Sequence, residues 1–232
     1  RNNLIHSGSV YTVAWSPDDA WVATGSNDQS IRLTNIGQLL GIAHVATPTR
    51  IQLQAGTIRT LAYLNENQLV AGCSGDSLLR CFDVSTQKLV WTHPTTPGSV
   101  IHTVSIPSRN SLICYATSAG QVFVFDHRSQ DMVYSISGHH GAVADFTNDF
   151  IAIGTEAGDI SLHDLNSRKL VWHRASAHSA SCRSVSVNES LLASVSFDKT
   201  VMLFDCENGK TVSVMRQHSD RVVHVEWDPT RT

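Results

Sequence analysis

Apolar and polar residues alternate with a period of two in short stretches of the chain, and these stretches recur at a regular interval. Five windows of equal length each hold two alternating runs around a polar or glycine-bearing centre. The windows start at residues 21, 69, 112, 150 and 191, so successive starts lie 48, 43, 38 and 41 residues apart. Two alternating runs around a turn predict a β-hairpin. We therefore expect five hairpins that align without a gap.

A shorter apolar segment lies on each side of every hairpin. The upstream segments occupy residues 10–15, 58–63, 101–106, 143–146 and 182–187. The downstream segments are clearest at residues 88–91 and 169–172, which both have the sequence K-L-V-W, and also occur at residues 132–136 and 211–215. Four short strands per repeat, with no helical period between them, predict an all-β array of four-stranded sheets.

The number of repeats indicates a ring of sheets that this sequence does not complete. A single domain is expected over residues 1–232, with repeats at about 6–55, 56–97, 98–137, 138–176 and 177–217 and a partial sixth at 218–232. Residues 222–227 repeat the pattern of residues 10–15, so a sixth repeat begins there. Because the chain begins at Arg1 without a methionine, we interpret it as part of a six- to eight-bladed ring. Missing sequence or a partner would then close the ring.

This repetition resembles the WD-repeat (WD40) family of β-propellers. In that family a His before the first strand, a Ser or Thr in the second and an Asp in the tight turn form a buried hydrogen-bonded chain, and Trp-Asp ends the third strand. The fifth repeat fits this pattern with His178, Ser194 and Asp198 and has Phe204-Asp205 at the Trp-Asp site. The resemblance implies that these residues form a structural network.

The other repeats depart from the family pattern to different degrees. The first repeat has His6, Thr24 and Asp28, but Thr34-Asn35 replaces Trp-Asp. The third and fourth repeats have alanine, at positions 119 and 157, where the turn Asp belongs. We expect intact polar networks in two repeats at most.

Within the family, some segments are similar to the propeller of the nemitin-like microtubule-associated proteins. They are residues 8–17, 23–28 and 56–59. This resemblance implies a cytoplasmic setting that is cytoskeletal or ciliary, and docking onto other microtubule-binding proteins.

Partners of WD-repeat propellers commonly dock on one face of the ring. That face carries the residues beside the first apolar position of the innermost strand and the residue just before the turn Asp. In this sequence the resemblance assigns the partner-binding role to Tyr11, Asn27, Arg59, His102, Glu156, Arg183, Phe197 and Arg221, with Ser9, Thr57, Val100, Ser118, Ala142, Ser181 and Val223 beside them. Arginine and aromatic side chains carry much of the binding energy at protein interfaces. The expected ligand is a protein or peptide with acidic and apolar groups.

Composition narrows the class of protein. The chain is 41% hydrophobic and 16% charged, which is ordinary for a globular domain. Its formal net charge of -3 and its lack of a basic run argue against bulk nucleic-acid binding. No apolar stretch is long enough to span a bilayer. The five cysteines never form C-x-x-C and fall mostly in apolar runs, so we expect buried thiols in a reducing, intracellular compartment.

No constellation of residues predicts catalysis, a metal or a cofactor. The 12 histidines include no H-E-x-x-H or H-x-H, and His6, His139, His178 and His218 each lie four residues before a first-strand position, where the family uses a structural histidine. Ser194 lies within an apolar run rather than in the exposed G-x-S-x-G turn of a hydrolase. The glycines match neither a P-loop nor a dinucleotide fingerprint.

The sequence therefore predicts a non-catalytic scaffold for complex assembly that binds proteins. The alternative is a propeller that binds RNA, an anionic lipid or a phosphorylated ligand through the same arginines. Steep salt dependence of binding would favour that alternative.

Overall fold

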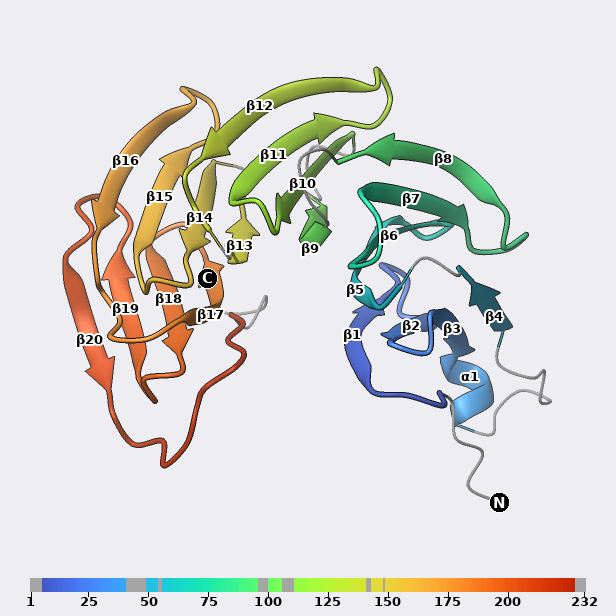
Figure 1. Cartoon of the computed structure of the whole chain (residues 1–232), viewed down its shortest axis with the longest axis horizontal. Helices are drawn as coiled ribbons and strands as arrows, with labels where there is room; N and C mark the ends of the chain where they lie inside the picture. The colour runs from blue at the N-terminus through green and yellow to red at the C-terminus, as the bar shows by residue number, and fades with distance from the viewer. Residues whose placement is uncertain are drawn as a thin grey trace. The chain divides into compact units, whose positions relative to one another are not determined.

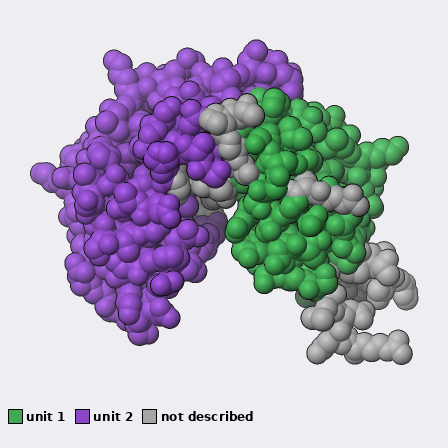
Figure 2. Space-filling model, in the orientation of Figure 1, with its two compact units in different colours: residues 1–105 green, residues 106–232 purple. Residues whose placement is uncertain are grey.

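The described part of the chain is built almost entirely from β-strands (Figure 1). The computed structural model describes residues 6–40, 49–53, 56–95, 100–105, 111–140, 143–147 and 149–227, with the backbone alone at 38–39 and 101–105. It holds 20 strands and one short helix, α1 at Ile36–Leu39. The chain forms two compact units, Arg1–Ser105 and Ile106–Thr232, which Figure 2 colours green and purple. A single domain over residues 1–232 stays a prediction.

The strands form five antiparallel sheets of four strands each. The first sheet has the order β1-β2-β3-β4, at Val10–Trp15, Trp21–Ser26, Ser30–Asn35 and Thr49–Gln52. The second has the order β5-β6-β7-β8, at Ile58–Asn65, Gln68–Cys73, Leu78–Asp83 and Leu89–Pro94. The third has the order β9-β10-β11-β12, at Val100–Ser105, Leu112–Thr117, Gln121–Asp126 and Asp131–Ser137.

The last two sheets lie in the second unit. The fourth has the order β13-β14-β15-β16, at Val143–Phe146, Phe150–Gly154, Ile160–Asp164 and Lys169–Arg174. The fifth has the order β17-β18-β19-β20, at Cys182–Val187, Leu191–Ser196, Val201–Asp205 and Thr211–Met215. The prediction of an all-β fold with five complete four-stranded blades is confirmed.

The second repeat differs from the gap-free alignment expected from sequence. The hairpin of the first sheet pairs Trp21 with Asn35, but that of the second sheet pairs Gln68 with Asp83, which makes its loop one residue longer. The second hairpin therefore starts one residue earlier than predicted. An extra turn residue changes neither alternating run, so the pattern of apolar positions did not reveal it.

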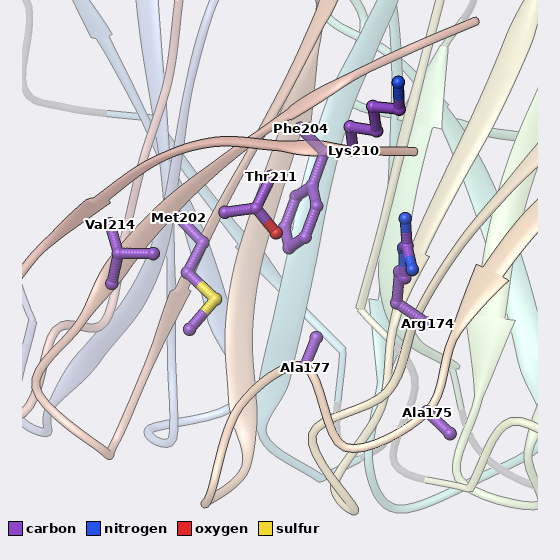
Figure 3. A pocket seen from close by; sticks show the side chains of 8 residues that line it. All are labelled: Arg174, Ala175, Ala177, Met202, Phe204, Lys210, Thr211 and Val214. Atoms are coloured by element: carbon purple, nitrogen blue, oxygen red, sulfur yellow. The ribbon is translucent and has the colours of Figure 1, made fainter. Parts of the chain in front are cut away.

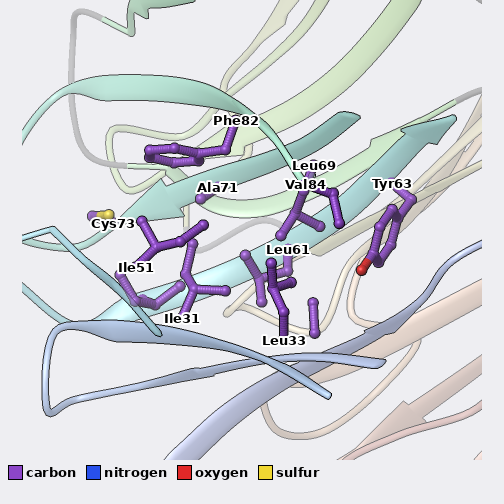
Figure 4. Close-up of a cluster of buried hydrophobic side chains, with 12 residues drawn as sticks. Ile31, Leu33, Ile51, Leu61, Tyr63, Leu69, Ala71, Cys73, Phe82 and Val84 are labelled. Atoms are coloured by element: carbon purple, nitrogen blue, oxygen red, sulfur yellow. The ribbon is translucent and has the colours of Figure 1, made fainter. Parts of the chain in front are cut away.

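Side chains from two neighbouring sheets form the core of the first unit (Figure 4). Ile31 and Leu33 of the first sheet meet Leu61 and Tyr63 of the second, and all four are buried. Each innermost strand thus packs onto the sheet that precedes it. Burial of apolar area of this kind contributes roughly 25 cal/mol per Å² to folding.

The start of β9 shows that the register predicted for the third repeat was wrong by one residue. Val100, expected to be exposed on the docking face, is fully buried. A Cβ atom added to Gly72 would meet the Val100 side chain, just as a Cβ on Gly25 would meet Ile58. Val100 is therefore the counterpart of Ile58. His102 then aligns with the buried Thr60 rather than with Arg59.

In the second unit, an aromatic residue on the outermost strand connects each sheet to the next. Trp172 of β16 is buried, and its indole Nε1 donates to the Cys206 carbonyl oxygen at 2.9 Å, with its ring 5.8 Å from that of Phe204. One sheet earlier, the Tyr134 hydroxyl donates to the Arg168 carbonyl oxygen at 3.0 Å. These contacts fix the outer end of each sheet against its neighbour.

The outermost strand of four sheets carries a β-bulge at the same place. In each, one valine is left out of the pairing with the third strand: Val90 in β8, Val133 in β12, Val171 in β16 and Val212 in β20. A bulge interrupts the hydrogen-bond ladder and twists an edge strand away from foreign strands. These outer edges are consequently poor templates for strand addition.

Residues 221–227, which carry the first-strand pattern of the expected sixth repeat, lie against the fifth sheet without forming a strand. The Val222 N–H donates to the Ser196 carbonyl oxygen at 3.1 Å, and the Trp227 indole donates to the Ser186 carbonyl oxygen at 2.9 Å. The segment therefore occupies the face on which an innermost strand would pack.

The cysteine prediction is confirmed at the level of structure. All five cysteines are free and buried. Burial raises the pKa of Cys81 and of Cys182 to about 12, so both stay protonated thiols at neutral pH. Within the described ranges, no helix is long and apolar enough to cross a membrane.

Candidate functional site

A hydrogen-bonded network holds the β2–β3 turn of the first sheet. His6 contacts Asp28 Oδ2 through Nδ1 at 3.0 Å and Thr24 Oγ1 through Nε2 at 2.8 Å. The Ser7 N–H donates to the same Asp28 oxygen at 3.0 Å. The His6 and Asp28 side chains are almost completely buried, at 2% and 6% exposed. All three residues that the family resemblance assigned to this repeat therefore meet.

The fifth sheet builds the same network with different residues. His178 contacts Asp198 Oδ2 through Nδ1 at 3.1 Å and Ser194 Oγ through Nε2 at 2.8 Å. Burial alone would raise the pKa of the Asp198 carboxyl. The Thr200 hydroxyl and the N–H groups of Thr200 and Ser179 hydrogen-bond to the carboxylate and lower that pKa to about 2. Asp198 is thus an ionised, stabilised turn residue.

One member of each network was missed in the sequence. Ser30 Oγ donates to Asp28 Oδ1 at 2.6 Å, and Thr200 Oγ1 donates to Asp198 Oδ1 at 2.6 Å. Both lie two residues after the turn Asp, in Asp-Gln-Ser and Asp-Lys-Thr. A hydroxyl at this spacing was the signal available, because a short polar side chain there closes a local turn with the carboxylate.

The remaining turns are stabilised without this network. In the second sheet Asp76 pairs with Arg80, whose Nη1 lies 3.2 Å from Asp76 Oδ1. The third and fourth sheets have Ala119 and Ala157 at the Asp position. Two networks in the described residues agree with the expectation of at most two.

Two of the four histidines expected to act structurally do not join such a network. His139 is half-buried, and its ring meets the ring of His163 edge-on, with centroids 5.9 Å apart. His218 is exposed to solvent. The predicted role holds for His6 and His178, which each face an Asp in their own sheet's turn.

A repeated backbone hydrogen bond joins the two segments that were predicted to form the docking face. The residue before the turn Asp donates its N–H to the residue before the innermost strand. This bond links Asn27 to Ser9 at 3.1 Å in the first sheet and Phe197 to Ser181 at 3.1 Å in the fifth. Similar bonds run from the Ser74 N–H, two residues before Asp76, to Thr57 at 2.9 Å and from the Glu156 N–H to His140, three residues before β13, at 3.1 Å. Turn and strand start therefore share one end of these four sheets.

In the first unit, two of the predicted docking residues stack on each other. The Arg59 guanidinium carbon lies 4.7 Å from the centre of the Tyr11 ring. Both side chains are exposed, Tyr11 by 50%. A guanidinium stacked on a ring keeps its in-plane N–H donors free for a carboxylate. We name this pair the Tyr11 cluster.

In the second unit, three predicted docking residues form a larger arrangement. The guanidinium carbons of Arg183 and Arg221 lie 5.1 Å and 4.8 Å from the centre of the Phe197 ring. Phe197 is half-buried, and both arginines are exposed. Cation–π contacts of this kind contribute roughly 0.5–1 kcal/mol each at exposed sites. We name these residues the Phe197 cluster.

The other predicted docking residues take part in neither cluster. Asn27, Ser118 and Glu156 are exposed at their turns, and Val223 is exposed in the segment that follows the fifth sheet. The side chain of His102 and all of Ala142 lie outside the described residues. Because the register of β9 is shifted by one residue, His102 does not occupy the docking position that the sequence predicted.

The geometry around Ser194 matches a structural network rather than a nucleophile. Ser194 is fully buried, and its hydroxyl is fixed by His178 in the middle of β18. A catalytic serine has to reach a substrate, and this one cannot. Among the described residues, no group of three His, Cys, Asp or Glu side chains is placed to hold a metal ion.

Family comparisons agree with this architecture. A family model described as "WD domain, G-beta repeat" matches residues 3–35, and one described as "Anaphase-promoting complex subunit 4 WD40 domain" matches residues 145–230. Both matches support assignment of the chain to the WD-repeat family. The five four-stranded sheets and the two turn networks agree with the blades and structural hydrogen bonds that this resemblance implies.

Similar WD-repeat proteins include several that are described as microtubule-associated. The chain is 27% identical over 237 residues to "Echinoderm microtubule-associated protein-like 4" of Xenopus laevis, covering 97% of this chain and 24% of that protein. The Homo sapiens protein of the same name is also 27% identical over 237 residues, with 97% and 23% covered. "Periodic tryptophan protein 2" of Arabidopsis thaliana is 22% identical over 139 residues, with 60% and 15% covered. The chain spans about a quarter of the length of the first relatives.

Proposed function

We propose that this WD-repeat chain is a non-catalytic scaffold that binds protein partners through the Tyr11 cluster and the Phe197 cluster. The observation that carries the proposal is the stacking of Arg59, Arg183 and Arg221 on aromatic rings at the sheet ends. A stacked arginine is held in place before a partner arrives, so less side-chain entropy is lost on binding. Its partner surface should offer carboxylates beside apolar groups.

The setting we propose is the cytoskeleton. The relatives with 27% identity over nearly the whole chain are named as microtubule-associated. This description agrees with the microtubule-associated branch suggested by residues 8–17, 23–28 and 56–59. We therefore place the scaffold in the cytoplasm, on microtubules or on proteins bound to them.

The proposed absence of catalysis rests on the way the reactive groups are used. The best Ser-His-Asp set in the chain is committed to holding a turn, with Asp198 accepting hydrogen bonds from Thr200 and Ser179. Ser194 is fully buried, so its hydroxyl is not accessible from the surface. These side chains stabilise a blade, and their hydrogen-bonding groups are already paired with one another rather than placed to activate a substrate.

Co-sedimentation with purified microtubules tests the proposal in the longer protein that contains this chain. The triple variant R59A/R183A/R221A should weaken binding by at least about tenfold, since each arginine at a binding centre contributes on the order of 1 kcal/mol or more. The control R128A/R168A/R216A removes the same charge from exposed positions outside both clusters.

Equal microtubule binding by both triple variants and the unchanged protein would refute the docking role proposed for Arg59, Arg183 and Arg221. Equal loss in both triple variants would instead indicate a general charge effect. Such a result, combined with steep salt dependence, would favour RNA or an anionic lipid as the ligand.

A further inference from the structure

An open groove lies between the fourth and fifth sheets of the second unit, and none of its lining residues belongs to the Tyr11 cluster or the Phe197 cluster (Figure 3). It encloses about 440 Å³. Met202 and Phe204 of β19 and Val214 of β20 form its floor, and Ala177 of the loop after β16 forms one wall. Figure 3 shows Arg174 and Lys210 on one side of Phe204, with Met202 and Val214 on the other. The groove thus has a cationic end and an apolar end.

The apolar end is not required by the repeat architecture. Met202 pairs with Val214 across β19 and β20. The equivalent cross-strand pairs in the other four sheets all include a polar side chain: Arg32 with Arg50, Arg80 with Thr92, Phe123 with Ser135, and Ser161 with His173. A blade can therefore form with polar residues here. An apolar pair left 38% exposed at Val214 needs another explanation.

The cationic end has unused hydrogen-bonding capacity. Arg174 Nε donates to the Gly209 carbonyl oxygen at 2.8 Å, which fixes the guanidinium and leaves its terminal N–H groups available. Lys210 is exposed, and its backbone N–H is bonded to Asn208. Among described residues, neither cation forms an ion pair with a carboxylate of this chain. Two positive charges at one end of a groove, one of them held in place, favour an anionic group.

We propose that this groove binds a peptide segment of a partner protein in which an acidic residue lies next to a bulky aliphatic residue. The carboxylate meets Arg174 and Lys210, and the aliphatic side chain covers Met202 and Val214. An open groove of this size accepts a short stretch of extended chain. The bulge at Val212 disrupts the neighbouring edge, so the peptide is held by its side chains rather than by strand addition.

Fluorescence anisotropy with the whole chain tests the proposal with a defined probe. The probe is a labelled ten-residue peptide in which glutamate and leucine alternate. Two comparison peptides replace every glutamate by glutamine or every leucine by serine. We expect only the first peptide to bind, because charge and apolar contact are both needed. Binding of all three peptides with equal affinity, or of none, would overturn the proposal.

Variants then locate the bound peptide. Lys210→Glu should weaken binding of the first peptide by about tenfold through charge reversal. Met202→Ser, which introduces the residue found at the equivalent place in the fourth sheet, should weaken it by a similar factor. Val212→Thr is the matched control, since Val212 is exposed on the same strand but does not line the groove. If Met202→Ser does not fold, Val214→Thr replaces it.

Two results would count against the groove. The first is unchanged affinity in both Lys210→Glu and Met202→Ser. The second is competition by decanoate at the peptide's own affinity, which would make the ligand a small lipid acid. The triple variant R59A/R183A/R221A should bind this probe normally, so failure of this proposal and failure of the proposed scaffold function can be distinguished.

Discussion

The β18–β19 turn of the fifth sheet and the β14–β15 turn of the fourth have the same length but are held by different forces. In the fifth sheet, the Asp198 carboxylate accepts four hydrogen bonds, and Lys199 takes a left-handed conformation with φ of 71°. In the fourth sheet, Ala157 replaces the Asp, and Gly158 takes the left-handed position with φ of 88°. A side-chain network can therefore hold a turn that glycine otherwise makes accessible.

The β2–β3 turn of the first sheet and the β10–β11 turn of the third sheet show the same two alternatives. Gln29 follows Asp28 with φ of 64°, whereas Gly120 follows Ala119 with φ of 82°. A non-glycine residue costs roughly 1–2 kcal/mol in this region. Sheets with the Asp network tolerate that cost, and sheets without the network avoid it. The stability of the first and fifth turns thus depends on buried polar groups, and that of the third and fourth on the backbone.

The largest expected effect is the loss of a network histidine. His178→Ala should lower the free energy of unfolding by about 3 kcal/mol, because it removes a buried partner of an ionised carboxylate. His218→Ala is the matched control, since His218 has the same spacing to its first-strand position but is exposed. It should change stability by less than about 0.5 kcal/mol. Denaturant unfolding of both variants measures the difference, and equal losses would contradict a network in the fifth sheet.

The next effect is a pH dependence specific to the fourth sheet. His163 is buried where three other sheets have Phe82, Phe125 and Phe204. Burial, together with the nearby His139 and His173, lowers the pKa of His163 to about 4. The unfolded chain takes up this proton near pH 6.5, whereas the folded chain does so only near pH 4. Stability is therefore lost as pH falls from 6.5 to 4.

At roughly 1.4 kcal/mol per pKa unit, the loss should be about 2–3 kcal/mol. His163→Phe should remove this part of the pH dependence, because phenylalanine fits the same position in three sheets and does not titrate. Unfolding midpoints measured from pH 7 to pH 4 test it. Parallel curves for the two proteins would rule out His163 as the source.

The smallest effect concerns the left-handed position itself. Gly158→Ala should cost about 1–2 kcal/mol, since alanine is strained there and its Cβ would meet the carbonyl oxygen of His178. Lys199→Ala at the equivalent place should cost less than about 0.5 kcal/mol, because that turn already holds a side chain. Thermal unfolding compares the two variants. A larger loss for Lys199→Ala would reverse the distinction between the turns.

The sequence predicted the parts of the fold that depend on alternation and on fixed spacing. Five hairpins, their outer strands and the six network residues of the first and fifth repeats follow from patterns that the backbone requires locally. The stacked arginines were also named, since Arg59, Arg183 and Arg221 occupy equivalent positions in the repeated first-strand pattern. These features depend on neighbours in sequence or on one repeated period.

Other features depend on small changes in register that leave the pattern intact. The longer loop of the second hairpin and the early start of β9 each shift residues by one position without changing the run of apolar residues. The bulge at Val90 and its equivalents also adds a residue inside an apolar stretch. The groove beside Phe204 combines residues from two sheets, and no spacing in the sequence indicates it.

Hydrogen–deuterium exchange of the longer protein with and without saturating microtubules tests the proposed docking residues most directly. We expect slower exchange on binding in peptides that contain residues 9–11, 57–59, 181–183 and 197, where the two clusters lie. Exchange in the buried outer-strand contact of Trp172 should stay the same. Full binding with unchanged exchange in all four of those segments would contradict the central claim.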